Sequence, residues 1–447
     1  MKTKKSLVVL AVITLVFALV FTTCSNGSTG GGGKDTGSTQ GQLAFERITS
    51  GENAGTWRVR KGTFKGGALV IPAYYNGSTG RAARGVEDGD PVTEIGSRED
   101  DEWSAAFVRA GITSVTIPNT VKLIGQFAFG WNNELTSVII PASVTEIWLG
   151  SFPACPNLAI TVEDGNPHYS SEDGILYTNI KDPAYDFDEE GRGIPQYTDN
   201  NEKTVLHSYP SASGSVTIKE GVTRICQQAF YFSTGLTSVT IPSSVTEIGR
   251  YAFLSAYNLT SVTIPSSVTE IGRGAFVGTD LTSITIPASV ASIGDSPFHS
   301  CKNLTSITVD SNNPNYSSEG GILYNKDKTT LLDYPSAKGN VTIKEGVTKI
   351  GWRVFYYCTS LTDITIPSSV TAIEWQAFAF CTNIPSITIP SSVEIMSIEV
   401  FAGWTSSQTI NLPFANQAAA DAAWEGWRQN YNGDDCENKA KINYNGS

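Results

Sequence analysis

The chain has 447 residues, of which 40% are hydrophobic and 17% are charged, and its formal net charge is −12. This acidic balance argues against nucleic acid and anionic lipid headgroups as partners, because both need a basic surface. Abundant glycine, two methionines and many aromatic residues favour a β-rich fold with many turns over a helical bundle.

Residues 1–23 have the pattern of a signal peptide. Lys2, Lys4 and Lys5 supply positive charge, and residues 7–21 form an apolar run that only Thr14 interrupts. This run is short for a bilayer-spanning helix and fits the hydrophobic region of a leader. Residues 24–42 are rich in glycine and serine and predict a flexible tether.

Cys24 stands directly after the apolar run and before the tether. A cysteine at this position resembles the processing site of a bacterial lipoprotein. The resemblance implies that Cys24 is lipidated and that the acyl chains attach the protein to a membrane. The alternative is ordinary cleavage nearby, with Cys24 lost or left as a free thiol.

A period of about 23 residues dominates residues 96–415. Eight apolar strands end in a proline, and neighbouring prolines within a group are 22 or 23 residues apart. These residues are Pro118, Pro141, Pro242, Pro265, Pro287, Pro367, Pro390 and Pro413. A fixed period of this size predicts a solenoid, in which each coil buries its apolar face against the next. We therefore expect an extended surface and not a deep pocket.

The coil that starts at Leu236 shows how each position is expected to be used. Val239 and Ile241 alternate with a threonine, as in a strand with one buried face, and Pro242 ends the strand. Gly249 is expected to permit a tight bend. A phenylalanine follows seven of the prolines at a spacing of eleven residues, and we expect one continuous stack of rings. These residues are Phe129, Phe152, Phe253, Phe276, Phe298, Phe378 and Phe401.

A second, longer repeat overlays the first. Residues 166–177 read NPHYSSEDGILY, and residues 313–324 read NPNYSSEGGILY. Each word is followed by a Tyr-Pro pair and then by VTIKEG. Between these matches the first copy carries 22 extra residues, so residues 180–202 are expected to form a loop outside the stack.

The words LTSVTIPSSVTEIG, the Ala-Phe pair that follows, and the NPxYSSxxGILY block resemble the BspA-type, or treponemal, class of leucine-rich repeat proteins. The resemblance covers roughly residues 90–415. It implies a right-handed leucine-rich repeat superhelix with a parallel sheet on its concave side, 22–23-residue coils and short helical turns. It also implies display on the bacterial surface, adhesion to matrix, host cells or microbes, and no enzymatic activity.

Both ends of the repeat region are expected to carry caps, which a solenoid needs to cover its open edges. Residues 43–95 are strand-like and aromatic and form the N-terminal cap region. Residues 416–447 form the C-terminal cap, in which an alanine-rich segment predicts a short helix over the last coil. Trp424 and Trp427 would share one face of that helix.

The outward positions of the long strands carry hydroxyl side chains, and this concave face is the first candidate for ligand binding. The candidate residues are Thr237, Ser238, Thr240, Thr260, Ser261, Thr263, Thr282, Ser283, Thr285, Thr362, Asp363 and Thr365. The alternative is that threonine merely suits the solvent-exposed face of a strand.

Tryptophans form the second group of candidates, because tryptophan and tyrosine dominate binding hot spots. They stand where other coils have small or polar residues, and about half of the aromatics at such positions are expected to fill packing gaps. The rim candidates are Trp131, Trp148, Trp352, Trp375 and Trp404.

Four cysteines occupy one equivalent position in four coils and are expected to be small buried side chains. They are Cys155, Cys301, Cys358 and Cys381, and a disulfide between the last two is sterically allowed. The histidines and acidic clusters lack the spacing of a metal site, and no nucleophile or phosphate-loop motif occurs. No metal, cofactor or enzymatic reaction is therefore expected.

These features together predict a lipid-anchored protein of the bacterial cell envelope, on the outer-membrane surface. It would bind protein or glycan ligands as an adhesin-like module. The alternative hypothesis is a structural envelope protein that self-associates and has no host ligand.

Overall fold

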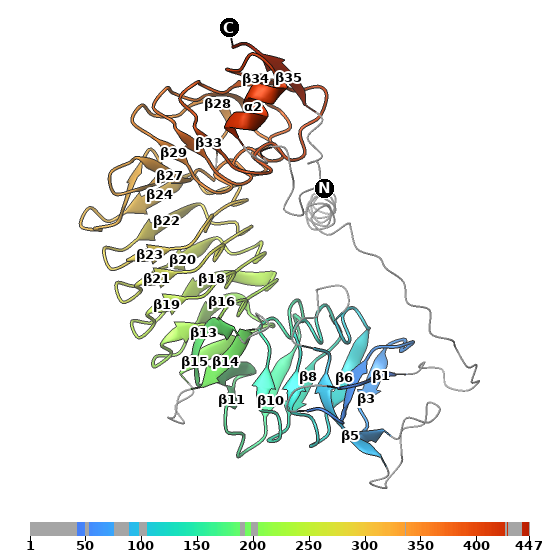
Figure 1. The fold of residues 1–447 in the computed structure, drawn as a ribbon. Helices are drawn as coiled ribbons and strands as arrows, with labels where there is room; N and C mark the ends of the chain where they lie inside the picture. Colours follow the sequence, from blue (N-terminus) through green and yellow to red (C-terminus); the bar gives the residue numbers. More distant parts are fainter. Residues whose placement is uncertain are drawn as a thin grey trace, which may run out of the picture. The chain divides into compact units, whose positions relative to one another are not determined.

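The computed structural model describes residues 43–49, 53–75, 89–97, 105–187, 193–197, 204–335, 337–424, 427 and 440–446. For residues 180–187 and 193–197 it describes the backbone alone. All of these residues belong to one compact unit, Gln40–Ser447. The predicted leader, Cys24 and the tether lie outside the described residues. The fold is a β-solenoid with parallel sheets (Figure 1), and pairing partners stand 23 residues apart, which confirms the predicted fold and period.

Each coil contributes one long strand, and the long strands of successive coils pair in parallel. Val239 lies opposite Val262, and both are buried, whereas Thr240 and Thr263 lie opposite each other and are exposed. The alternation of valine and threonine therefore gives the ladder one buried and one hydroxyl-bearing face. The ladders are β3 (Gly67–Val70) with β6 (Ile112–Thr116); β8 (Ser137–Ile140) with β10 (Ala159–Val162); β16 (Ser213–Thr217) with β18 (Gly235–Thr240) and β20 (Ser261–Thr263); β22 (Ser283–Ile286) with β24 (Ser306–Val309); β28 (Gly339–Thr342) with β30 (Leu361–Thr365); and β32 (Ser386–Thr388) with β34 (Thr409–Leu412) and β35 (Lys441–Tyr444).

A second set of parallel ladders is built from short strands on another side of the coils (Figure 1). Ile225, Ile248 and Ile271 follow one another in register and are fully buried. The ladders are β5 (Asp90–Ile95) with β7 (Leu123–Ile124) and β9 (Glu146–Ile147); β15 (Val205–Ser208) with β17 (Arg224–Ile225), β19 (Glu247–Ile248), β21 (Glu270–Ile271) and β23 (Ser292–Ile293); and β27 (Thr330–Asp333) with β29 (Lys349–Ile350), β31 (Ala372–Ile373) and β33 (Ile395–Met396).

The third side of each coil is a turn that hydrogen-bonds to the turn of the next coil. The N–H of Phe253 donates to the carbonyl of Ala275 at 2.8 Å. Tyr251 and Ser255, four residues apart in the same turn, have φ angles of 53° and 60°. Both lie in the left-handed region, which non-glycine residues adopt rarely. These hydrogen-bonded turns stand where short helical turns are predicted.

Where a glycine follows a short strand, as at Gly249 and Gly272, it is required by a close approach of the preceding coil. A Cβ on Gly249 would lie 2.6 Å from the backbone nitrogen of Gln227, and one on Gly272 would lie 2.5 Å from that of Arg250. Neither glycine is among the residues of positive φ. Their role is therefore to leave space between coils, and not to supply the conformational freedom that the sequence suggests.

The predicted phenylalanines stack, but the prediction of one continuous stack is wrong. Phe253 and Phe276, for example, have centroids 5.2 Å apart and an interplanar angle of 3°. The three stacks are Phe107–Phe129–Phe152, Phe230–Phe253–Phe276–Phe298 and Phe355–Phe378–Phe401. The second and third stacks begin beside a tyrosine, Tyr209 or Tyr334, whose ring is tilted by 51° against the first phenylalanine.

Two antiparallel hairpins cause these breaks. The first joint hairpin pairs β11 (Tyr169–Glu172) with β12 (Ile175–Thr178), and the second pairs β25 (Tyr316–Glu319) with β26 (Ile322–Asn325). β12 and β26 then pair antiparallel with β15 and β27, after which parallel pairing resumes. The short-strand ladder therefore ends before each hairpin and restarts after it.

The insertion in the first copy forms a hairpin of its own. β13 (Ile180–Phe187) pairs antiparallel with β14 (Gly193–Tyr197), and these two strands make up their sheet among the described residues. β12 and β15, on either side of the insertion, still pair with each other. The extra residues therefore leave the stack of coils intact.

The two ends of the described chain differ from the repeating coils. At the N-terminal end, β1 (Ala44–Arg47) and β4 (Tyr74–Tyr75) pair antiparallel with β2 (Trp57–Arg60) and β5, respectively. At the C-terminal end, α2 (Gln417–Ala423) starts at Asn416, whose side chain accepts the N–H of Ala419 at 3.0 Å. Trp424 and Trp427 are buried, and Trp424 donates to the carbonyl of Val393 at 3.1 Å. The short helix predicted here is therefore present, but it ends at Ala423, so Trp424 and Trp427 follow the helix and do not share one of its faces.

Candidate interaction surface

The asparagine of each Asn-Pro-x-Tyr word connects the start of a joint hairpin to the preceding coil. Asn313 Nδ2 donates to two carbonyls of the preceding coil, each at 2.9 Å. Its Oδ1 accepts from the N–H groups of Asn315 and Tyr316, each also at 2.9 Å. Asn166 makes the same set of bonds in the first joint. Both amides are buried, so these residues are structural.

The tyrosine of the same word ends a ladder. The hydroxyl of Tyr316 accepts the N–H of Ile293 at 2.8 Å, and that of Tyr169 accepts the N–H of Ile147 at 2.7 Å. Ile147 and Ile293 belong to the last short strand before each hairpin, where no further strand pairs. The phenol oxygen therefore replaces the missing backbone acceptor.

The glutamate of each word pairs with the lysine of the downstream VTIKEG word. Lys344 Nζ lies 2.7 Å from Glu319 Oε1, and Lys219 pairs with Glu172 at the first joint. Hydrogen bonds from Lys328 and Lys344 lower the pKa of Glu319 to about 2. The duplicated words are thus accounted for by contacts within the solenoid.

The hydroxyl-bearing residues predicted for the ligand face lie on the outer face of the long-strand ladders. All twelve are exposed except Ser238, which is partly exposed. Ser238 donates to Ser215 Oγ at 2.7 Å, and Thr260 donates to the carbonyl of Thr237 at 3.1 Å. Some hydroxyls thus bond along the ladder, while Thr240 and Thr263 present theirs outward.

The serine two residues after the proline has a different role. Ser244 Oγ donates to the carbonyl of Val222 in the preceding coil at 2.7 Å. The same bond recurs from five further serines to valine carbonyls: Ser143, Ser267, Ser289, Ser369 and Ser392. This serine fastens neighbouring coils and does not belong to the ligand face.

Two of the five rim tryptophans are packing residues, which corrects the prediction for them. Trp404 is 1% exposed, and its indole donates to the carbonyl of Phe378 at 2.8 Å. Trp148 is buried, and its indole contacts Glu146. Trp131, Trp352 and Trp375 are partly exposed and lie on the turn side of the coils.

A cluster of aromatic and arginine side chains lies on this turn side and spans the second joint. We call Arg273, Trp352, Arg353, Tyr356 and Trp375 the Trp–Arg cluster. Arg353 Cζ lies 4.3 Å from the ring centroid of Trp375 and 4.9 Å from that of Tyr356. Arg273 Cζ lies 5.4 Å from the centroid of Trp352, which is 5.5 Å from that of Trp375. The cluster therefore alternates guanidinium groups and aromatic rings.

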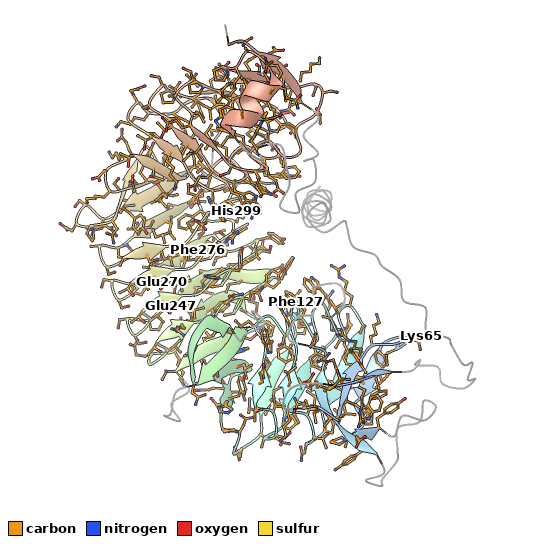
Figure 2. All side chains as sticks on the ribbon, in the orientation of Figure 1. Lys65, Phe127, Glu247, Glu270, Phe276 and His299 are labelled. Atoms are coloured by element: carbon orange, nitrogen blue, oxygen red, sulfur yellow. The ribbon has the colours of Figure 1, made fainter. Side chains whose placement is uncertain are left out.

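The side chain of His299 adjoins this cluster and carries no charge at neutral pH. Its ring lies 5.4 Å from that of Tyr356. Desolvation, reinforced by the positive charge of Arg353, lowers the pKa of His299 to about 3. Figure 2 labels His299 and Phe127 on the turn side and Glu247 and Glu270 on the short-strand side.

The equivalent surface at the first joint is largely apolar and has one arginine, Arg109, whose Cζ lies 5.4 Å from the ring centroid of Trp131. Phe127 and Trp131 lie about 6 Å from Tyr231, at centroid distances of 6.2 and 6.1 Å. Leu254 and Val277 extend this buried cluster along the next two coils. The two joints therefore present different chemistry on the same side of the solenoid.

Sequence reasoning did not single out the two arginines of the cluster. Arg273 and Arg353 are 80 positions apart and belong to coils on opposite sides of the second joint hairpin. The signal available was the replacement of small turn residues by tryptophan and arginine in the words GWRVFYYC and EWQAFAFC.

The equivalent cysteines are packing residues, as predicted. Cys155, Cys301 and Cys381 are fully buried, and Cys358 is partly exposed. Cys358 and Cys381 are both free thiols in the structure. Burial raises the pKa of Cys358 to about 12, so its thiolate is disfavoured. Among the described residues, no group of three or more His, Cys, Asp or Glu side chains is arranged to hold a metal ion.

No helix in the described part of the chain has both the length and the apolar character needed to cross a membrane.

The stacked parallel coils, their buried leucine, valine and isoleucine positions and their phenylalanine stacks define a solenoid of the leucine-rich repeat class. The chain belongs to the family described as BspA type leucine rich repeat region. Six copies of the family's repeat match residues 103–172, 208–319 and 335–428, more than half of the chain.

Solved structures of bacterial leucine-rich repeat proteins resemble this chain. A leucine rich cell surface protein from Faecalibacterium prausnitzii is 25% identical, with 93% of this chain and 96% of that chain covered and a TM-score of 0.45. The pneumococcal vaccine antigen PcpA is 15% identical, with coverage of 90% and 98% and a TM-score of 0.37. A leucine-rich repeat protein from Eubacterium ventriosum is 21% identical, with coverage of 81% and 95% and a TM-score of 0.37. No curated protein matches the sequence. The family assignment therefore rests on the repeat motifs.

Proposed function

We propose that this chain is a lipid-anchored protein displayed on the bacterial surface, where its coils bind macromolecular ligands as an adhesin-like module. The family and the leader with Cys24 support this proposal. The observation that carries it is the row of exposed hydroxyl side chains on the long-strand ladders. An extended protein or glycan would meet the same donors and acceptors in coil after coil, and many weak contacts would add up to stable attachment. The proposal assigns no catalytic step to the chain.

A pair of substitutions on the ligand face tests this proposal. Residues 40–447, which form one compact unit, are immobilised and exposed to extracellular matrix proteins and to whole cells. Thr240→Lys with Thr263→Lys places two long charged side chains on the hydroxyl face and is expected to reduce saturable binding. Thr246→Lys with Thr269→Lys adds the same charge at exposed positions beside the short strands and is the matched control. Equal binding by both pairs would contradict the role of the hydroxyl face.

The insertion hairpin provides a second test. Deletion of residues 180–202 is expected to preserve the stack, because β12 and β15 pair across the insertion. If the hairpin contributes to ligand binding, the deletion weakens binding to matrix or cells without lowering the melting temperature.

Anchoring and display are tested on living cells. Cys24→Ser is expected to abolish incorporation of radiolabelled palmitate, and a membrane-impermeant fluorophore is expected to label the solenoid on intact cells. The alternative function, a self-associating envelope component, predicts a different outcome. It predicts concentration-dependent assembly in sedimentation experiments and no saturable binding to matrix or cells.

A further inference from the structure

The two arginines of the Trp–Arg cluster form no direct ion pair, although Glu399 acts on Arg353 from a longer distance. Arg273 and Arg353 form no ion pair with any acid of the described residues. Arg353 Nε donates to Gln376 Oε1 at 2.7 Å, and Gln376 in turn contacts Glu399. Asp295, on the turn that follows Arg273, forms no ion pair with it either. Two neighbouring guanidinium groups therefore share a surface without an anion between them.

Partly exposed aromatic rings surround these charges. Trp352 and Trp375 are partly exposed and tilted by 59° to each other, so they present two differently oriented faces. The indole N–H of Trp375 is buried and has no hydrogen-bond partner. This donor cannot be reached from solvent, so Trp375 offers a bound molecule the face of its ring.

The guanidinium group of Arg353 is held in place by the rings beside it. The residue's φ angle of 53° is typical of this turn position, where Tyr251 and Gln376 have φ angles of 53° and 54°. The side chain stacks between Trp375 and Tyr356, which fixes the direction of its guanidinium group.

The remainder of the surface limits the size of an anionic ligand. The chain carries a net charge of −12, and Glu247 and Glu270 lie opposite each other on adjacent coils. A long, uniformly charged polymer would be repelled by such a surface, whereas a short acidic segment with one charged group at the cluster would meet two arginines. Guanidinium groups bind carboxylate and sulfate oxygens in pairs, and flat indole faces pack against the C–H face of a pyranose ring.

We propose that the Trp–Arg cluster binds an acidic sugar unit of a glycan chain. Arg273 and Arg353 hold its carboxylate or sulfate, and Trp352 and Trp375 contact its ring. This inference rests on the proposed function, since it names one ligand class for a surface-binding module. The first-joint cluster, which has a single arginine, Arg109, takes no part in it.

Calorimetric titration of residues 40–447 with defined octasaccharides tests the proposal. The probes are a hyaluronan octasaccharide, which carries carboxylates, a chondroitin sulfate octasaccharide, which also carries sulfates, and a neutral chitin-derived octasaccharide. An octaglutamate peptide represents the other class of acidic ligand. At least one acidic octasaccharide is expected to bind, more weakly as salt rises, while the neutral sugar and the peptide bind at least tenfold more weakly.

Arg273→Gln and the double variant R273Q/R353Q are expected to weaken binding at least tenfold, the scale of one lost charged hydrogen-bonded pair. Arg250→Gln is the matched control, because Arg250 is exposed at the same position of the preceding coil and carries the same charge. If the double variant is unstable, R273Q alone tests the proposal, because Arg273 is partly exposed whereas Arg353 is packed between rings. Circular dichroism melting checks that each variant folds.

Three results would overturn the proposal. They are no binding of either acidic octasaccharide, equal binding by R273Q and R250Q, or equal binding of octaglutamate with the same sensitivity to R273Q. Binding to matrix proteins and cells is measured on the same variants. If that binding persists without any acidic-sugar binding, this inference fails and the proposed function stands; if both are absent, the proposed function fails.

Discussion

Asp333 Oδ2 accepts the backbone N–H of Phe298 at 3.0 Å, so a carboxylate after the second joint hairpin holds the last phenylalanine of the preceding stack. Asp333 is 1% exposed, and its Oδ1 has no hydrogen-bond partner. Burial raises the pKa of this carboxyl to about 7, although the N–H groups of Phe298 and Tyr334 act in the opposite direction. The joint therefore contains an acid that titrates near neutral pH.

The stability contribution of Asp333 is expected to fall as pH rises. Its pKa is higher in the folded chain than the ordinary value of 3.8, so the folded state binds a proton that the unfolded state has released. The contribution is complete below about pH 4 and is lost as pH rises towards 7. Urea unfolding at pH 5, 6, 7 and 8 should show wild type losing up to about 1.4 kcal/mol per pH unit relative to Asp333→Asn. His207 and His299, whose pKa values burial lowers, act with the opposite sign but equally in both proteins. A difference that stays constant over this range would contradict the assignment.

Asn313→Ala is expected to destabilise the chain by roughly 2–4 kcal/mol, because it removes four buried hydrogen bonds and leaves their partners unsatisfied. Chemical denaturation monitored by tryptophan fluorescence measures the change. Asn133→Ala is the control, since Asn133 is exposed, and its effect should stay within about 0.5 kcal/mol. Similar losses for the two variants would argue against the structural role of the Asn-Pro-x-Tyr word.

Tyr316→Phe is expected to cost about 1–2 kcal/mol, because the N–H of Ile293 loses the hydroxyl that accepts its hydrogen bond while the ring is kept. Hydrogen exchange of the Ile293 amide should accelerate more than exchange in the middle of the ladder, for example at Ile248. Tyr74→Phe, a partly exposed tyrosine of the N-terminal cap, is the matched control. Unchanged exchange at Ile293 would show that the hydroxyl does not end the ladder.

Two glycine substitutions separate space from backbone conformation. Gly272→Ala places a Cβ 2.5 Å from the backbone nitrogen of Arg250, so coils must move apart, and a loss above about 3 kcal/mol is expected. Gly278→Ala meets its nearest atom, on Tyr257, at an ordinary 3.6 Å, and its φ of 70° should cost about 1 kcal/mol. Thermal unfolding of the two variants gives the ranking. A larger loss of stability for Gly278→Ala than for Gly272→Ala would mean that the backbone conformation, and not the space between coils, limits the substitution of these glycines.

The repeating part of the fold could be predicted because one pattern decides it locally. The proline period, the Val239–Ile241 alternation and the phenylalanine eleven residues later each follow from the need of one coil to bury one face. The breaks in the stack could not be read in this way. The Asn-Pro-x-Tyr words are visible in the sequence, but the antiparallel pairing that follows them is not. In the first copy, β12 of the hairpin pairs with β15, which lies beyond a 22-residue insertion.

The candidate site was predicted less completely than the fold. Exposure of the hydroxyl residues followed from strand alternation, and twelve positions lie outward as expected. The two tryptophans Trp404 and Trp375 occupy different positions of the repeat. Trp404 stands three residues after a stacked phenylalanine, where other coils have a buried cysteine, whereas Trp375 stands three residues before one, where other coils have arginine. Their surroundings decide between them: Trp404 reaches the carbonyl of Phe378 inside the core, whereas Trp375 stacks on Arg353.

The joint hairpins also bear on how such a chain can lengthen. A block that begins at one Asn-Pro-x-Tyr word and ends before the next carries its own hairpin at one edge and its own final short strand at the other. Duplication of a whole block would bring both matched edges with it, whereas gain of a fragment would leave an unpaired strand open to aggregation. Growth by complete blocks is thus the low-risk route for this architecture, and a new block would arrive with its own turn-side surface free to diverge.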